Sequence, residues 1–410
     1  MNSFSAAFTS EGGAEFTGGS APLRTEGDLL IRGAKILVGP DAPPIERGNV
    51  LVRQGKIAEV GPSVTATANA RVIDGERRVL AAGFWNSHVH FTEAKWRRMR
   101  PHDQPLIEAH LHDMFTSRGF TTVIDTGSDP RTTLRLRHRI EHERWLGPRI
   151  FTAGPGLYPP RGIPYYLRST VPFFLRPFLP TPSNPQRARR TVERSVARGV
   201  DLIKLFTGSY VARGTVKPMP EPIARAAVET AHAHGRLVFS HPSNLEGTRV
   251  AVRSGVDVLA HPPDMTGGVD ESLLGEIVTR GISMIPTLQM FERTVSTSRS
   301  YLEPIYEIVR RFHALGGSLL FGTDVGFMTD YSIDDELKGL VGCGLAPREI
   351  LRSLTTAPAE RFGVGQVVGT VVPGARADLV LLDADPFENP RAFTRVHATV
   401  RGGRILHLRK

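Results

Sequence analysis

The sequence is poor in cysteine and has no hydrophobic run long enough to cross a membrane. A single cysteine, Cys343, stands among 410 residues, which excludes a disulfide framework or a cysteine-based zinc knuckle within one chain. No apolar run reaches the roughly 18 residues that a membrane-spanning helix needs. The N-terminal segment is rich in Gly, Ser and Ala and lacks the basic and apolar regions of a signal peptide. We therefore expect a flexible leader over residues 1–27, a cytoplasmic location and no membrane partner.

Lysine is also scarce, and the formal net charge of +10 comes from arginine. Only seven of the 51 basic side chains are lysines. The densest arginine clusters lie at residues 96–100 and 186–190. Such runs more often form a solvated helix face than a phosphate-binding track, and no known nucleic-acid-binding signature accompanies them. We expect a small-molecule substrate and no nucleic-acid partner, and leave open whether the chain forms a homo-oligomer.

The distribution of apolar residues predicts an α/β fold. Between residues 83 and 324, eight short apolar segments alternate with helical patterns, which is typical of a (β/α)8 TIM barrel. We predict barrel strands at residues 83–91, 121–126, 149–153, 200–206, 236–241, 256–261, 282–286 and 319–324. Strand-like stretches at both chain ends predict a small β-sandwich domain assembled from residues 28–82 and 362–410. The barrel domain would then span residues 83–361.

One insertion interrupts the predicted barrel. Residues 154–185 carry nine prolines and many aromatic side chains, directly after the third strand. Barrel loops on that side build active sites, and a loop of this length in a compact domain is usually functional or disordered. The alternatives are an ordered surface loop or a membrane-facing patch, which Arg168 and Arg176 would interrupt. We favour a lid, lined by Tyr158, Tyr165, Tyr166, Phe173 and Phe174.

Histidines and an aspartate end four of the predicted strands. His88 and His90 are two residues apart at the end of the first strand, so their side chains point to the same face. His241, His261 and Asp324 end three later strands. Any one of these could be a satisfied core residue, but all five would project into the same barrel mouth. Such a nitrogen and oxygen set suits Zn, Mn, Fe, Ni or Co.

Lys204 is unusual because it lies in the middle of an apolar strand. Lysine is rarely fully buried unless it is paired, and this chain otherwise prefers arginine. A buried lysine has a lowered pKa and is more often neutral. A neutral amine can add CO2 to form a carbamate that bridges two metals. We favour this carboxylated lysine over a simple ion pair with Asp324.

These features together resemble the amidohydrolase superfamily, within it the imidazolonepropionase-like and prolidase-like metal-dependent hydrolases. The resemblance runs from residue 28 to the end and includes residues 80–93 (LAAGFWNSHVHFTE) and the tail over 356–386. It implies a barrel capped by a small β-sandwich. The implied metal ligands are His88, His90 and Asp324 for a buried ion, His241 and His261 for a second ion, and carboxylated Lys204 as the bridge. Residues 207–210 and 260–263 depart from the dipeptidase pattern, which counts against a dipeptide substrate.

The predicted activity is hydrolysis of a C–N bond, amide or peptide-like, in a small molecule. A divalent metal, preferably zinc, would supply a bound hydroxide, with two ions if Lys204 is carboxylated and one if it is not. Asp324 would act as the general base. The alternatives are hydrolysis of a lactone, carbamate or phosphoester, and a catalytically inactive barrel scaffold. From loop placement alone, the candidate substrate contacts are Arg161, Tyr165, Tyr210, Arg213 and Gln289.

Overall fold

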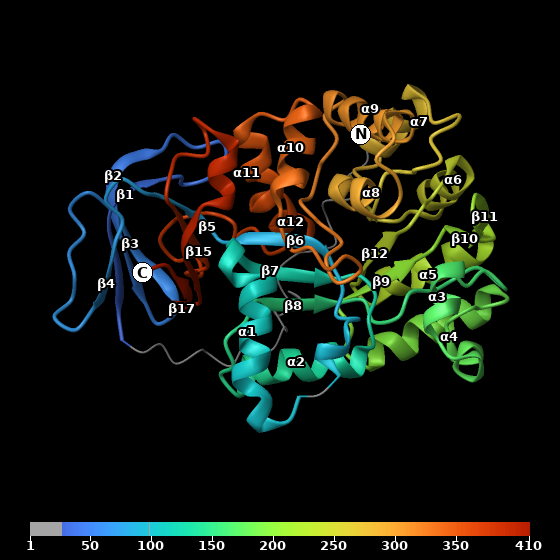
Figure 1. Ribbon diagram of the computed structural model, residues 1–410, viewed down its shortest axis with the longest axis horizontal. Coiled ribbons are helices and arrows are strands. Elements are labelled where there is room, and N and C mark those ends of the chain that lie inside the picture. Colours follow the sequence, from blue (N-terminus) through green and yellow to red (C-terminus); the bar gives the residue numbers. More distant parts are fainter. Residues whose placement is uncertain (1–26, 98) are drawn as a thin grey trace.

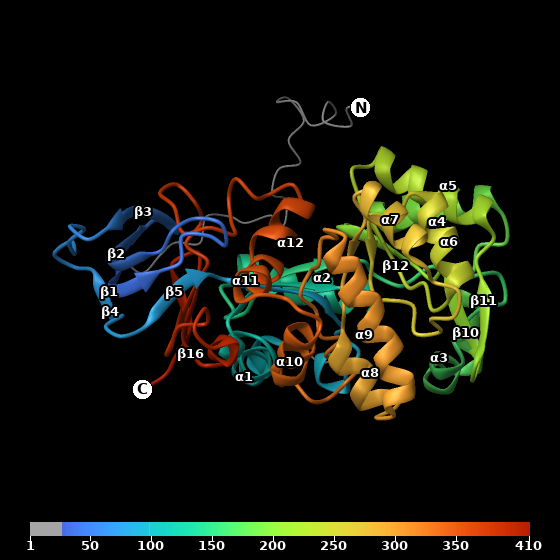
Figure 2. The same ribbon diagram turned by 90° about the horizontal axis from the view of Figure 1, so that it is seen from above.

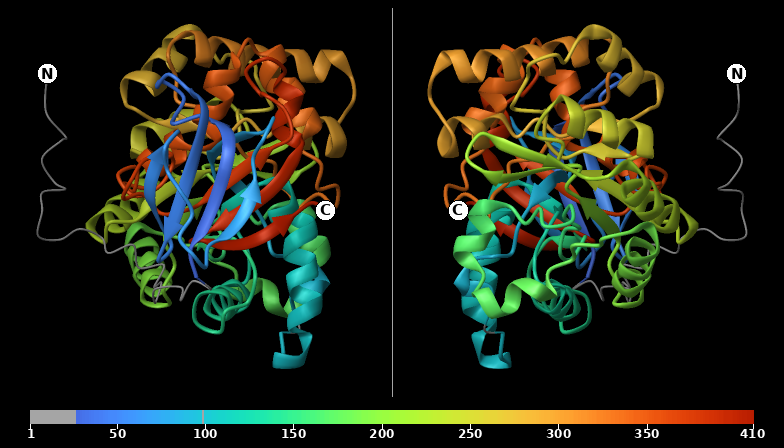
Figure 3. Two further views of the ribbon diagram at one scale, coloured as in Figure 1. Left: turned by 90° about the vertical axis from the view of Figure 1, so that its left-hand side faces the viewer. Right: turned by 90° about the vertical axis from the view of Figure 1, so that its right-hand side faces the viewer.

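A mixed β-sheet at one end of the molecule brings together strands from residues 29–82 and 379–408 (Figures 1 and 3). The computed structural model describes residues 27–97 and 99–410, so the predicted leader lies, except for residue 27, outside the described residues. The sheet order is β17-β16-β15-β5-β1-β2-β3, with β4 also paired to β1. The strands are β1 (Leu29–Ile36), β2 (Ile45–Arg53), β3 (Lys56–Gly61), β4 (Arg71–Asp74), β5 (Val79–Ala82), β15 (Leu379–Leu382), β16 (Val396–Arg401) and β17 (Arg404–Leu408).

The predicted β-sandwich is not confirmed, because these eight strands form one sheet in the described part of the chain. The long strand β1 explains the continuity. Its first half pairs with β4 and its second half with β5, on the edge opposite β2. Strand β5 then pairs with β15, which brings the C-terminal strands into the same sheet. A separate core of apolar side chains lies on this sheet, including Ile31, Val50 and Leu381.

Parallel strands form the centre of the molecule, in two sheets rather than one closed ring. The first holds β6 (Phe84–Val89), β7 (Phe120–Asp125) and β8 (Arg149–Thr152). The second holds β9 (Leu202–Leu205), β12 (Leu237–Ser240), β13 (Val258–Leu259) and β14 (Ser283–Met284). Seven of the eight predicted barrel strands are thus present, each shorter than or shifted from the prediction. All their residues except Leu237 are buried, as expected of a parallel sheet covered on both faces.

The eighth predicted strand, residues 319–324, is not a regular strand, although its backbone reaches both sheets. Leu320 donates to the carbonyl of Met284 at 2.9 Å, and Ser87 donates to the carbonyl of Phe321 at 2.7 Å. Asp324 and Gly326 both have positive φ, which interrupts extended pairing. On the other side, Asp201 donates to the carbonyl of Thr152 at 2.9 Å and so links β8 to the segment leading into β9.

Helices surround the parallel strands (Figures 1 and 2). Side-chain N-caps from Asp129, Asn184, Asn244 and Asp270 open α2, α4, α6 and α7 by accepting backbone N–H groups. The helices are α1 (Gln104–Met114), α2 (Pro130–His142), α4 (Pro185–Ala197), α5 (Glu221–Ala233), α6 (Leu245–Ser254), α7 (Glu271–Thr279), α8 (Leu288–Thr294), α9 (Arg299–Ala314), α10 (Asp334–Gly342), α11 (Pro347–Leu354) and α12 (Thr356–Arg361). The arginines of α4 are exposed while Ala188 and Val192 are buried, as expected for a solvated helix face.

The proline-rich insertion is only partly a cover over the strands. It contains a short helix, α3 (Tyr165–Thr170), and a 3-10 helix, Phe173–Phe178. Its first residues are buried, and Leu157 pairs with Leu205 beside β9. Phe173 and Phe174 are instead exposed, so they do not line an interior. No helix in the described part of the chain has the length and apolarity that spanning a membrane requires.

Two buried ion pairs tie the region of the mixed sheet to the rest of the fold, one at strand β8 and one at helix α2. Arg149 on β8 donates to Asp378 at 2.8 Å, and both side chains are at most 4% exposed. Arg401 on β16 pairs with Glu141 on α2, equally buried. Asp378 also accepts the backbone N–H of Gly402 at 2.8 Å. Because each charge has a partner, the burial is tolerated, but removal of either partner leaves an uncompensated charge.

Candidate metal centre

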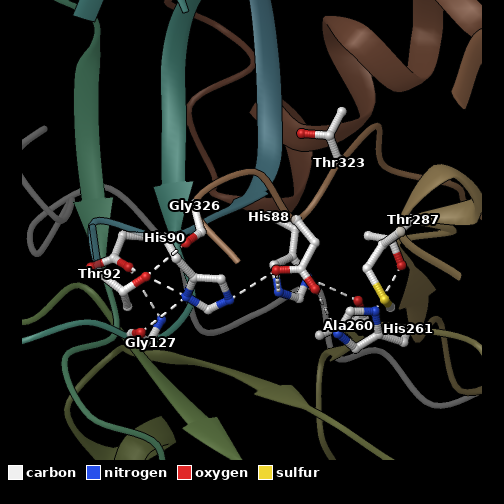
Figure 4. Close-up of polar contacts among 12 residues, drawn as sticks. His88, His90, Thr92, Gly127, Ala260, His261, Thr287, Thr323 and Gly326 are labelled. Carbon is white, nitrogen blue, oxygen red and sulfur yellow. Dashed lines mark hydrogen bonds and ion pairs between the residues drawn. The ribbon is translucent and has the colours of Figure 1, made fainter. Parts of the chain in front are cut away.

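The end of β6 places two imidazoles on one face, as the two-residue spacing predicts. The Nδ1 atom of His88 lies 2.9 Å from the carbonyl oxygen of Ala260, and the Nδ1 atom of His90 lies 2.9 Å from that of Gly127 (Figure 4). A carbonyl can only accept a hydrogen bond, so each Nδ1 carries the proton. Each Nε2 atom then presents a lone pair, which is the state that a metal-binding histidine needs.

His261 is held in the same tautomer by a threonine. Its Nδ1 atom lies 2.7 Å from the hydroxyl of Thr287 (Figure 4). That hydroxyl donates its own hydrogen to the carbonyl of Pro286 at 2.8 Å. The hydroxyl has one hydrogen, so toward His261 it acts as an acceptor. The proton of His261 therefore lies on Nδ1, and its Nε2 atom is free to bind a cation.

These three Nε2 atoms converge on the carboxylate of Asp324. The Oδ1 atom is 3.0 Å from His90 and 3.5 Å from His88, and the Oδ2 atom is 3.8 Å from His261. The ligand atoms of His88, His261 and Asp324 all lie within 4.8 Å of one another. Zinc bound tetrahedrally at about 2.0–2.1 Å from each ligand places its ligands about 3.4 Å apart. The donor atoms therefore have the spacing of a coordination shell.

His241 extends the group to four imidazoles. Its ring centroid is 4.7 Å from that of His261, which is 4.5 Å from that of His88. The ring of Phe206 stacks on His241 at 4.9 Å and covers one of its faces. Burial, followed by the charges of neighbouring basic groups, lowers the pKa of His88, His241 and His261 well below the usual value. These three imidazoles are thus neutral at pH 7 and available as ligands.

His90 differs in its electrostatics. Burial lowers its pKa, but the hydrogen bond and charge of Asp324 outweigh this and raise the pKa of His90 above its usual value. The carboxylate of Asp324 therefore favours a proton, and with it a positive charge, on His90. A bound cation would supply that charge in place of the proton.

Lys204 reaches the same group from the middle of β9. Its side chain is 2% exposed, and its Nζ atom has no hydrogen-bond partner among the described residues. The Nε2 atom of His88 is likewise buried without one. Burial lowers the pKa of Lys204 to about 7, against the opposing charge of Asp324. An amine that is substantially neutral and unsatisfied fits both readings open to it, carbamate formation and metal binding.

Two residues of the candidate centre have a strained backbone. Asp324 has φ of 60° and Thr287 has φ of 46°, in the left-handed region that residues other than glycine rarely adopt. Gly326 also has positive φ, and a Cβ atom there would lie 1.9 Å from the carbonyl oxygen of His90. The loop after residue 324 can therefore close over His90 only with glycine at this position.

Asp125 was not predicted from the sequence. It ends β7 and is fully buried, accepting hydrogen bonds from Ser128 at 2.6 Å and Thr152 at 2.7 Å. Its carboxylate also accepts from the backbone of Gly127, whose carbonyl holds His90. A polar residue at the end of a buried strand was the available signal. Thr287 gave no signal, because its role depends on an unusual backbone conformation.

The predicted substrate contacts are scattered. Arg161, Arg213 and Tyr165 are exposed. Gln289 is fully buried, and its amide bonds to Ser332 and to the backbone N–H of Glu336, which ties α8 to α10. Tyr210 is half-buried and donates to Asp264 at 2.7 Å.

Comparison with known proteins agrees with this arrangement. The Amidohydrolase family model matches residues 79–406. The chain is 24% identical over 376 residues to an adenine deaminase of Deinococcus deserti, which covers 90% of this chain but only 59% of that relative. It therefore spans less than two thirds of that curated relative.

The fold is similar to that of two solved structures. One is a Xaa-Pro dipeptidase with bound methionine in the active site, with a TM-score of 0.80, 21% identity, and coverage of 92% of this chain and 99% of that one. The other is a molinate hydrolase, with a TM-score of 0.78, 18% identity, and coverage of 93% and 95%. The resemblance inferred from the sequence is thus confirmed by the family match, and the chain belongs to the Amidohydrolase family.

Proposed function

We propose that this chain is a divalent-metal-dependent hydrolase that cleaves a C–N bond in a small molecule. The observation that carries the proposal is the set of three Nε2 lone pairs, on His88, His90 and His261, directed at Asp324. Each of the three Nδ1 atoms has its own hydrogen-bond acceptor, on Ala260, Gly127 and Thr287. Such contacts orient imidazoles for metal binding.

The same proposal assigns the remaining ligands. His241 and His261 would hold a second ion, and Lys204 would bridge the two ions as a carbamate. Support comes from the contact of the two rings and from the buried, unsatisfied amine of Lys204. Zinc is the ion we expect, because imidazole and carboxylate ligands at this spacing suit it.

We also propose a barrel domain over residues 83–361 and a second domain from residues 28–82 and 362–410.

The side chains around the metal centre would act on water and on the substrate. A divalent metal held by these residues would supply a Lewis acid for the water and for the scissile carbonyl. Asp324, with its carboxylate between His88 and His90, would accept the proton of the attacking water and deliver it to the leaving nitrogen. The left-handed conformation of Asp324 holds its side chain at this point. Apolar neighbours such as Phe206 and Phe291 would exclude bulk water from the imidazoles.

A panel of 4-nitroanilides and 4-nitrophenyl esters, assayed with zinc-reconstituted protein, tests the proposal. We expect anilide hydrolysis in the wild type and a loss of about 10²–10⁴ in kcat for Asp324→Asn, the range for a general base. Asp113→Asn, at an exposed carboxylate, is the control and should retain activity. An Asp324→Asn variant that keeps its metal and full turnover would contradict the assignment of the base. Ester hydrolysis without anilide hydrolysis would contradict the C–N preference.

A further inference from the structure

The strongest feature outside the metal ligands is a half-buried carboxylate, Asp264, at the edge of the centre. Asp264 lies three residues beyond His261, in the loop between β13 and α7. The ring centroids of His261 and Phe291 are 6.0 Å apart, and those of Phe291 and Tyr301 are 6.5 Å apart. Tyr301 donates its hydroxyl to Asp264 at 3.0 Å. A continuous line of side chains therefore connects a metal-ligand candidate to this carboxylate.

Asp264 has phenols but no cation for a partner. Tyr210, on β10 (Gly208–Ala212), and Tyr301, on α9, both donate to its Oδ2 atom, at 2.7 and 3.0 Å. No ion pair of the described residues includes Asp264. By contrast, Asp378 pairs with Arg149 and Asp201 pairs with Arg137. Glu292 and Glu336 also lack a basic partner among the described residues, but Asp264 is the one linked to His261, through Phe291 and Tyr301.

The surroundings of Asp264 are aromatic. Tyr210 and Tyr301 bond to it, Phe291 lies next to Tyr301, and the faces of such rings attract cations. A negative group within aromatic rings is the arrangement that recognises ammonium ions.

No arginine pairs with Asp264 among the described residues. Arg161 and Arg213, which the sequence suggested as substrate contacts, are exposed. Both phenols donate to the Oδ2 atom of Asp264, so its Oδ1 atom accepts no side-chain hydrogen bond from the described residues. We propose that Asp264, Tyr210 and Tyr301 bind a cationic group of the substrate, an ammonium or a guanidinium, while the bond to be cleaved lies at the metal centre. This inference rests on the proposed function.

A plain structural role makes a different prediction. If Asp264 only fastens its loop to β10 and α9, the charge is incidental and the hydrogen bonds alone matter. Asp264→Asn separates the two roles, because the amide oxygen can still accept from both phenols while the negative charge is lost. Asp113→Asn removes an exposed charge elsewhere and serves as the matched control.

The first test is binding, which does not depend on turnover. Calorimetry with the zinc-loaded protein compares benzylammonium with benzyl alcohol, which share a ring and differ in charge. We expect the wild type and Asp113→Asn to bind benzylammonium about tenfold more tightly than the alcohol, as one charge-assisted contact allows. Asp264→Asn should bind the two equally. Equal affinities in the wild type, or no binding of either compound, would overturn the inference.

The second test is specificity in turnover. The 4-nitroanilides of alanine and N-acetylalanine differ in one ammonium group, as do those of Nα-acetyl-lysine and Nα-acetyl-norleucine. In at least one pair, the wild type should show a kcat/KM about tenfold higher for the cationic member, and Asp264→Asn should abolish that ratio. A fall of both members by the same factor would show a structural role instead. Selective binding of benzylammonium without hydrolysis of any anilide would refute the proposed function and leave the cation site standing.

Discussion

The hydroxyl of Thr287 is the contact whose removal tests the metal centre most specifically. Thr287→Val keeps the size and the β-branching of the side chain, so the strained φ of 46° is equally costly in both proteins. What is lost is the acceptor 2.7 Å from the Nδ1 atom of His261. A buried N–H left without an acceptor costs about 1–3 kcal/mol.

His261 can avoid that cost by moving its proton to Nε2. That atom faces Asp324 at 3.8 Å, and a proton there blocks the lone pair that a cation needs. Loss of a hydrogen bond to a metal-binding histidine typically weakens metal affinity 10–100-fold. We therefore expect the zinc dissociation constant of Thr287→Val to rise by about that factor, or about 1.4–2.8 kcal/mol.

Competition with a chromophoric chelator measures the dissociation constant, and Thr287→Ser is the matched variant. Serine keeps the hydroxyl, so its affinity should stay within about threefold of the wild type. Thermal unfolding of the metal-free proteins shows whether each variant is folded. If valine bound zinc as tightly as threonine, the proposed role of the hydroxyl in setting the tautomer would be refuted. If serine were as weak as valine, side-chain shape and not the hydroxyl would be responsible.

Two further predictions concern the fold and the loop over His90. Burial raises the pKa of Asp378, but Arg149 and Arg401 outweigh this effect and lower the pKa below its usual value. The ionised carboxylate therefore stabilises the fold at pH values above the unfolded pKa of about 3.9. This stabilisation is lost as the pH falls through the pKa of the folded state. Asp378→Asn should thus lower the free energy of unfolding in urea at pH 7 by about 3–5 kcal/mol and flatten its decline below pH 4; an unchanged value would contradict this. Gly326→Ala should lower zinc content because its Cβ would meet the carbonyl of His90, whereas Gly344→Ala, also at positive φ but with no atom within 4 Å, should not; equal effects would show that backbone strain alone is responsible.

Period-two side-chain alternation and the position of polar residues at strand ends were sufficient to find the core of the candidate site. His88 and His90 share a face because they are two residues apart on a strand, and Asp324 and His261 meet them because the carboxyl ends of parallel strands lie together. Lys204 stood out because a lysine in an apolar strand needs a reason. These inferences need only local sequence and strand direction.

The remaining features depend on contacts between distant residues. The role of Thr287 follows from a left-handed backbone that no sequence pattern marks, and Asp264 is made distinctive by phenols 54 and 37 residues away. Gln289 follows a predicted strand, as a substrate contact might be expected to do, but α10 packs over it and takes its amide. The sequence indicated strand-like stretches at both chain ends, whereas the continuity of their sheet depends on β1 being long enough to pair with both β4 and β5.

The central claim is that four imidazoles, Asp324 and Lys204 together hold a catalytic divalent metal. The most direct measurement is bound metal per chain after reconstitution with zinc, together with intact mass before and after mild acid. Our proposal predicts close to two zinc ions per chain and an acid-labile gain of one CO2, both lost in Lys204→Gln. A single ion without the adduct would refute the bridged pair of ions but keep a mononuclear centre. A chain that takes up no metal after reconstitution would contradict the proposed function itself.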